Sequence, residues 1–251
     1  MTERGSSLFD EGVRLVRSAA ERGVTLRLMG ALAVRARCPR TWPIAEALGR
    51  HTADVDVVGL SRQWDALVTA GEALGYRFDE RYAMLHGNDR LLFHHPSGFR
   101  VDVFLDGVHL CHTIDLRERL GLHPLTLSVS DLLLQKLQIV ELTTKDVIDI
   151  AVLLLEHGLS GEPAIDPDYI SHLLAGDWGF HRTATLNLGR VREGELDSLG
   201  GISEDGRRTV RERIGLLLER VEAAPKSLAW RLRARIGPRV RWYREVGELA
   251  R

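Results

Sequence analysis

Cysteine is nearly absent from the sequence, since Cys38 and Cys111 are the two present among 251 residues. They stand 73 positions apart (111 minus 38) and form no C-x-x-C pair, so neither a disulfide scaffold nor a zinc module is indicated. Residues 1–10 are polar and contain no hydrophobic leader. Together these features predict a protein of the reducing cytoplasm.

Long hydrophobic runs are also missing. The longest, such as residues 151–155, are far shorter than the roughly 20 apolar residues of a membrane-spanning helix, so we expect no membrane partner. The formal net charge is -1, which argues against a protein that coats nucleic acid through bulk electrostatics. A hydrophobic content of 44% is enough for a sizeable core.

Charge is unevenly placed along the chain. Residues 203–251 contain 13 Lys or Arg and 7 Asp or Glu, an excess of six positive charges, which leaves the first 202 residues at about seven negative (-1 minus 6). In the tail from Lys226, arginines alternate with Trp230, Trp242 and Tyr243. This pattern fits either an RNA acceptor site or an amphipathic helix that packs its tryptophans on the core, and we favour packing.

Apolar periodicity divides the chain into an α/β front and a helical rear. In the front, the pattern predicts helices at 8–22, 31–37 and 61–74, a loop at 38–50 with a short helix at 44–48, and strands at 24–29, 54–58, 81–86, 90–95 and 99–105. The last three strands are typical of an antiparallel meander. Ser130 and Asp131 open an apolar helix to about Val140, Thr143 or Thr144 caps the next helix, and helices continue to the end. The fold class is α+β, with an α/β domain over residues 1–125 and a helical domain over residues 126–251.

Three aspartates carry the main functional signal. Asp54 and Asp56 are two residues apart in a predicted strand, so their side chains share one face, where a hard divalent cation would relieve their repulsion. Asp102 stands in a second apolar strand. If the two strands are neighbours, the three carboxylates converge as a pair of Mg²⁺ ions about 3.5–4 Å apart requires. The alternative is a solvated strand edge with an ordinary outward-facing Asp102.

Gly30 stands at the predicted turn from strand to helix, within Met29-Gly30-Ala31. A glycine there lets backbone N–H groups approach a phosphate, and the following helix N-terminus favours an anion. Taken alone, Gly30 is more often a plain turn glycine.

The order of these motifs resembles the DNA polymerase β-type nucleotidyltransferase superfamily. A glycine follows the first strand, R-x-T-x-D-x-D runs from Arg50 to Asp56, and an apolar strand carries Asp102. The segments Ser130–Leu137 and Lys145–Asp149 are similar to the AbiEii-like group, which includes toxins of toxin–antitoxin systems.

This resemblance, over about residues 24–156, implies a nucleotidyltransferase-type mixed β-sheet with flanking helices, followed by a helical C-terminal region. It implies transfer of a nucleoside monophosphate from an NTP to an acceptor such as tRNA or other RNA, a protein or a small molecule, with Mg²⁺ or Mn²⁺. Asp54 and Asp56 would hold both metals, and Asp102 would complete the catalytic metal site or serve as base. An antitoxin protein is a further implied partner.

The nucleotide would contact Gly30, Ala31 and Thr52. The family has Gly-Gly or Gly-Ser where this chain has Gly30-Ala31, a departure that leaves open a weak or inactive protein of the same fold that binds nucleotide or a protein partner.

A helical part of the predicted nucleotide pocket would come from Lys136, Lys145 and Asp146. Lys136 interrupts an apolar helix and could reach a phosphate, or it could snorkel to the surface. Lys145 and Asp146 begin the next helix, where the alternative is exposed helix charges or a partner of the helix dipole.

Overall fold

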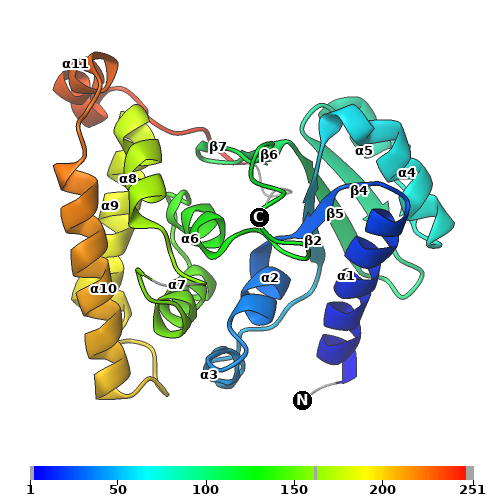
Figure 1. The fold of residues 1–251 in the computed structure, drawn as a ribbon, viewed down its shortest axis with the longest axis horizontal. Coiled ribbons are helices and arrows are strands. Elements are labelled where there is room, and N and C mark those ends of the chain that lie inside the picture. Colours follow the sequence, from blue (N-terminus) through cyan, green and yellow to red (C-terminus); the bar gives the residue numbers. More distant parts are fainter. Residues whose placement is uncertain (1–2, 161–162, 247–251) are drawn as a thin grey trace. The chain divides into compact units, whose positions relative to one another are not determined.

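The computed structural model describes residues 3–160 and 163–246 and shows a mixed α+β protein (Figure 1). These residues form two units. Unit 1 consists of the described residues up to 37 together with 51–109 and 113–128, and unit 2 consists of 38–50, 110–112 and the described residues from 129 onward. None of the described helices is both long and apolar enough to span a membrane.

Unit 1 contains a five-stranded mixed sheet in the order β1-β2-β5-β4-β3. The strands are β1 (Leu26–Leu28), β2 (Val55–Gly59), β3 (Arg77–Phe78), β4 (Arg90–His94) and β5 (Arg100–Leu105). β2 and β5 pair in parallel, whereas the other three pairings are antiparallel. A separate ribbon joins β6 (Gly107–His109) to β7 (Thr113–Asp115).

The central strands β2 and β5 are rich in valine and are buried almost throughout. Val55, Val57 and Val58 of β2 are fully buried, and so are nearly all side chains of β5. Branched side chains suit a sheet that is covered on both faces, which accounts for these short, nearly continuous apolar runs. The two aspartates within these strands are therefore exceptions that need an explanation.

The helical elements of unit 1 are α1 (Glu3–Glu21), α2 (Gly30–Arg37), η1 (Ser61–Gln63), α4 (Trp64–Ala73) and α5 (Glu80–His86). α1 packs on β1, β2 and α4 through its buried stripe of Leu15, Val16 and Ala19. α2 follows β1 directly and packs on β2. The predicted strand, glycine and helix at residues 24–37 are present, with the strand shortened to β1.

The predicted strand at 81–86 is wrong, because these residues form α5. Asp79 caps this helix, and its Oδ1 accepts a hydrogen bond of 3.0 Å from the backbone N–H of Tyr82. The apolar residues that imitated a strand, Met84 and Leu85, are more than three-quarters exposed. The three-stranded meander is therefore wrong as well: β4 and β5 form a hairpin, and β5 takes β2 as its parallel neighbour.

Unit 2 is helical. Its elements are α3 (Trp42–Ala47), α6 (Val129–Leu137), α7 (Thr144–Glu156), α8 (Pro167–Gly176), α9 (Trp178–Arg190), the π-helix η2 (Val191–Glu195), α10 (Glu204–Ala223), α11 (Leu228–Ile236) and η3 (Gly237–Arg239). Thr143 caps α7, as one of the two predicted caps, and it also forms a capping box with Asp146. α10 packs on α7, α8 and α9.

Residues 38–50 belong to unit 2, whereas the sequence placed them in the 1–125 domain. α3 packs on α7, and Thr41 donates hydrogen bonds from its N–H to Glu156 (2.9 Å) and from its hydroxyl to the Val152 carbonyl (3.1 Å). The last change from unit 1 to unit 2 falls between Ser128 and Val129, whereas the sequence placed the domain boundary between residues 125 and 126. These contacts join residues more than 100 positions apart, so local sequence patterns carry no sign of them.

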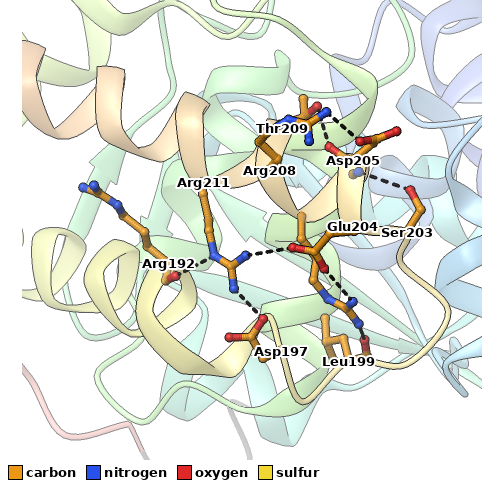
Figure 2. A network of polar contacts seen from close by, with 11 residues as sticks. Arg192, Asp197, Leu199, Ser203, Glu204, Asp205, Arg208, Thr209 and Arg211 are labelled. Atoms are coloured by element: carbon orange, nitrogen blue, oxygen red, sulfur yellow. Dashed lines mark hydrogen bonds and ion pairs between the residues drawn. The ribbon is translucent and has the colours of Figure 1, made fainter.

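A network of ion pairs and hydrogen bonds at the surface joins the start of α10 to residues 192–199 (Figure 2). Arg211 pairs with Asp197 and donates to the carbonyl of Arg192 (3.2 Å), and Arg208 pairs with Asp205 at 2.6 Å. Ser203 caps α10. Exposed pairs of this kind contribute little each, typically below about 1 kcal/mol, so we assign the network a structural role.

Candidate active site

Asp56 and Asp102 lie side by side in the sheet. In the parallel pairing of β2 with β5, the two residues are direct register partners. Neighbouring strands are about 4.8 Å apart, and register partners project to the same face. Asp54 stands two residues before Asp56, just ahead of β2, and its charge acts on Asp102. The three aspartates named from the sequence are thus brought together in unit 1.

Asp102 is the buried member of this carboxylate cluster, with 5% of its surface exposed. Burial raises the pKa of its carboxyl above the ordinary value, although Arg90 and Arg100 act in the opposite direction. Arg90, from the neighbouring strand β4, makes an ion pair of 2.9 Å with Asp102 Oδ1. The same guanidinium lies over the ring of Phe104, 4.4 Å from its centroid, which fixes its position.

Arg100 stands at the start of β5, on the more exposed side of the cluster. Its Nη2 is 3.4 Å from Asp54 Oδ2, and its side chain is 41% exposed. The pKa of Arg100 is raised, first by the hydrogen bond to Asp54 and further by the charges of Asp102 and Asp56. Three carboxylates and two guanidinium groups leave one net negative charge (-3 plus 2).

Neither arginine was predicted from the sequence. Arg100 is two residues before Asp102, and the alternation of a strand puts both on one face, so that spacing could have identified it. Arg90 could not be found in this way, because its contact with Asp102 depends on the antiparallel register of β4 with β5.

Gly30 lies against the carboxylate of Asp56. Its backbone has a φ of +60°, and a Cβ atom added there would be 2.6 Å from Asp56 Oδ2. The backbone N–H of the preceding Met29 donates to the Asp56 carbonyl at 3.0 Å. Only glycine satisfies both the left-handed backbone and this close approach. Gly30 therefore places the first turn of α2 beside the cluster, where a helix N-terminus favours negative charge.

The other residues predicted at the nucleotide in unit 1 are Ala31 and Thr52. Ala31 is half-buried in the first turn of α2, and Thr52 is half-buried two residues before Asp54. The methyl group of Ala31 supplies no hydrogen-bond donor, so any phosphate contact at this turn comes from the backbone.

The predicted residues Lys136, Lys145 and Asp146 belong to unit 2. Lys136 Nζ lies 2.8 Å from Asp149 Oδ2 and 3.3 Å from Asp146 Oδ1. Arg50 holds the same Asp149 through two hydrogen bonds of 2.9 Å. Lys136 is therefore already paired within this buried ionic network of Arg50, Lys136, Asp146 and Asp149, and its role at a phosphate stays a prediction.

The pKa shifts in this network follow its pairing. Burial disfavours the charge of Lys136, but Asp149 and Asp146 outweigh it and raise the pKa of Lys136. Burial likewise opposes the charge of Asp149, while Lys136 and Arg50 overcome it and lower the pKa of Asp149. Asp146 also accepts hydrogen bonds from Thr143 in the capping box, and Lys145 is exposed. Asp146 is thus an N-terminal partner of α7.

The donor chemistry of the carboxylate cluster fits a hard divalent cation, since Asp54, Asp56 and Asp102 supply oxygen ligands at one end of two adjacent strands. Among the residues that the structure describes, however, no group of three or more His, Cys, Asp or Glu side chains is arranged closely enough to hold a metal ion. Arg90 and Arg100 pair with two of these three carboxylates instead.

Comparison with known proteins finds no family model that matches the chain and no significant match to a curated protein.

Proposed function

We propose that unit 1 is a nucleotidyltransferase domain that moves a nucleoside monophosphate from an NTP to an acceptor, with Mg²⁺ or Mn²⁺ as cofactor. The observation that carries the proposal is the register pairing of Asp56 with Asp102 on parallel strands, with Gly30 against Asp56. A buried and a half-buried strand carboxylate beside a glycine turn and a helix N-terminus serve a cation and a phosphate better than they serve folding.

In this proposal Asp54 and Asp56 would hold the cation, and Asp102 would complete the metal site or accept the proton of the acceptor hydroxyl. The acceptor oxygen would bond to the α-phosphorus of the NTP, and pyrophosphate would leave. A bound divalent cation would lower the pKa of that hydroxyl and neutralise the triphosphate. The backbone N–H groups at Gly30 and Ala31 contact a phosphate. Arg100, the more exposed arginine, would release the carboxylate of Asp54 and bind a phosphate oxygen when nucleotide enters.

The resemblance to the AbiEii-like group extends the proposal to a cytoplasmic toxin of a toxin–antitoxin pair, with tRNA or another RNA as acceptor and an antitoxin as partner. A second candidate is an inactive protein of the same fold that binds nucleotide or a protein partner. Ala31 favours it, and so do Arg90 and Arg100, because they neutralise most of the charge that would attract a cation.

The test is transfer of label from each α-labelled NTP, with Mg²⁺ or Mn²⁺, to RNA or protein by the full-length chain. The Asp54→Ala/Asp56→Ala variant should abolish labelling. The matched control is Asp65→Ala/Glu72→Ala, which removes the same charge from the exposed face of α4 in unit 1. NTP binding without transfer supports the inactive alternative that binds nucleotide. Neither binding nor transfer by the wild type would refute the nucleotidyltransferase proposal and leave only the alternative that binds a protein partner.

A further inference from the structure

Among the described residues of unit 2, the ring contacts of α11 lie on one side of this helix. Arg233 lies over the ring of Trp178, 4.5 Å from its centroid, and Trp230 meets the ring of His181 edge-on at 5.1 Å. The helix has no fully buried residue, and it contacts α9 (Figure 1). Its tryptophan is thus turned toward the unit, in agreement with the packing interpretation of the sequence.

The opposite side of α11 presents an aliphatic row to solvent. Leu228, Leu232 and Ile236 follow a spacing of four residues, and they are 73%, 51% and 47% exposed. Residues four apart on a helix lie above one another, so the three side chains form one continuous ridge. Single exposed leucines are ordinary, but an ordered apolar ridge on one helix is typical of an interaction surface.

A basic row runs beside this ridge. At 100° per residue, Arg231 and Arg235 project next to Leu228 and Leu232. Both arginines are exposed, and no side-chain ion pair engages either of them within the described chain. The surroundings are strongly basic, since residues 226–246 contain seven Lys or Arg and one acidic residue, a net charge of +6.

We propose that this face of α11, made of Leu228, Leu232, Ile236, Arg231 and Arg235, binds an acidic amphipathic helix of another protein. Such a helix supplies aliphatic side chains to cover the ridge and carboxylates to pair with the arginines. This inference is independent of the activity proposed for unit 1.

Other occupants fit the same face less well. A second copy of α11 would bring arginines against arginines. RNA is read through aromatic stacking, yet Trp230 is turned inward and the exposed ridge is aliphatic. A membrane surface also accepts a leucine face flanked by arginines, so vesicle binding is one outcome of the test below.

The probe is a fluorescent peptide of about 20 residues, long enough to form a helix, with a leucine ridge flanked by glutamates. A matched peptide carries lysines in place of the glutamates. Binding to the full-length protein is followed by anisotropy. The wild type should prefer the acidic peptide by about tenfold or more, as expected for complementary against opposing charges.

The variants assign the binding to α11. Leu232→Asp should weaken binding of the acidic peptide at least about tenfold, and Arg231→Glu/Arg235→Glu should reverse the preference between the two peptides. The matched control is Leu216→Asp on α10 of the same unit, where the leucine is 56% exposed, and its binding should be unchanged. Circular dichroism verifies that each variant is folded.

Equal binding of both peptides, no binding, or binding that Leu232→Asp leaves intact would overturn the proposal. So would a preference for phosphatidylglycerol vesicles or for a single-stranded RNA over the acidic peptide. Sedimentation that shows a dimer, lost in Leu232→Asp, would assign the ridge to self-association instead.

Discussion

Asp56 on β2 lies directly opposite Asp102 on β5, so two carboxylates share one face of a parallel strand pair. Arg90 and Arg100 balance part of their charge, and Gly30 leaves the space that the Asp56 carboxylate occupies. This arrangement gives the cluster a stable form without a cation. It also implies that cation binding depends on how firmly the arginines hold their partners.

Replacing Arg100 should therefore strengthen cation binding. Arg100→Gln changes the net charge of the cluster from -1 to -2 (three carboxylates and one guanidinium), which favours a divalent ion. We expect the affinity for Mn²⁺ to rise severalfold, measured by calorimetric titration. Arg62→Gln is the control, because Arg62 is exposed in η1 of the same unit. An unchanged or lower affinity in Arg100→Gln would show that Arg100 does not compete with the ion.

Gly30→Ala should disturb both the backbone and the carboxylate. The left-handed backbone at φ +60° costs alanine about 1–2 kcal/mol, and its Cβ would meet Asp56 Oδ2 at 2.6 Å. Gly23→Ala is the matched control, since Gly23 has a φ of +73° and open space around it. Urea denaturation should show a larger loss for Gly30→Ala, together with weaker Mn²⁺ binding. Equal losses would remove the steric argument.

The buried ionic network should be sensitive to loss of its central carboxylate. Asp149→Ala leaves Arg50 and Lys136 without their shared partner, and breaking a buried pair costs about 3–5 kcal/mol. Asp168→Ala removes an exposed partner of Arg220 and should cost below about 1 kcal/mol. Urea midpoints compare the two. Similar small losses would mean that water reaches the network.

Lys136→Met separates the structural role of Lys136 from a role at phosphate. Asp149 keeps Arg50, so we expect some loss of stability with unchanged NTP affinity in a fluorescence titration. A folded Lys136→Met protein with weakened NTP binding would instead support the phosphate contact predicted from sequence.

His112 should make the protein less stable as the pH falls from about 6.5 to 4. Burial lowers the pKa of His112 from 6.5 to about 4, where the neutral ring stacks on Phe180 and hydrogen-bonds to Thr183 at 2.8 Å. In this window the unfolded chain binds a proton that the folded chain excludes, so stability falls by up to about 3 kcal/mol.

The measurement is urea denaturation of the wild type and His112→Gln across this pH window, with His172→Gln as an exposed control in the same unit. The wild type and the control should lose more stability on acidification than His112→Gln does. Parallel losses in all three proteins would assign the acid sensitivity to other groups.

The sequence sufficed for features that arise locally. The helix cap at Thr143 and the glycine turn at Gly30 depend on neighbouring residues, and both are present. A strand that carries Asp56 was predicted, although β2 begins at Val55 and Asp54 lies in the bend before it. The nearness of Asp102 to Asp56 required only that two apolar strands be neighbours.

One error was local: Met84 and Leu85 imitated a strand, although the Asp79 cap was a signal for the helix α5. The other features depended on long-range contacts. Arg90 reaches Asp102 only through the register of β4 with β5, and residues 38–50 join unit 2 through partners on α7. The ion pair of Lys136 with Asp149 likewise could not be predicted, because it depends on where α7 packs.

Titration of Mn²⁺ into the full-length wild type and Asp56→Asn, followed by electron paramagnetic resonance with a non-hydrolysable NTP analogue present, tests the metal site most directly. Asp56→Asn keeps the shape of the side chain and removes its charge, and Asp65→Asn on α4 is the control. We expect wild-type binding that Mg²⁺ displaces, at least about tenfold weaker binding in Asp56→Asn, and no change in the control. Absence of wild-type binding, or equal affinity in Asp56→Asn, would contradict it.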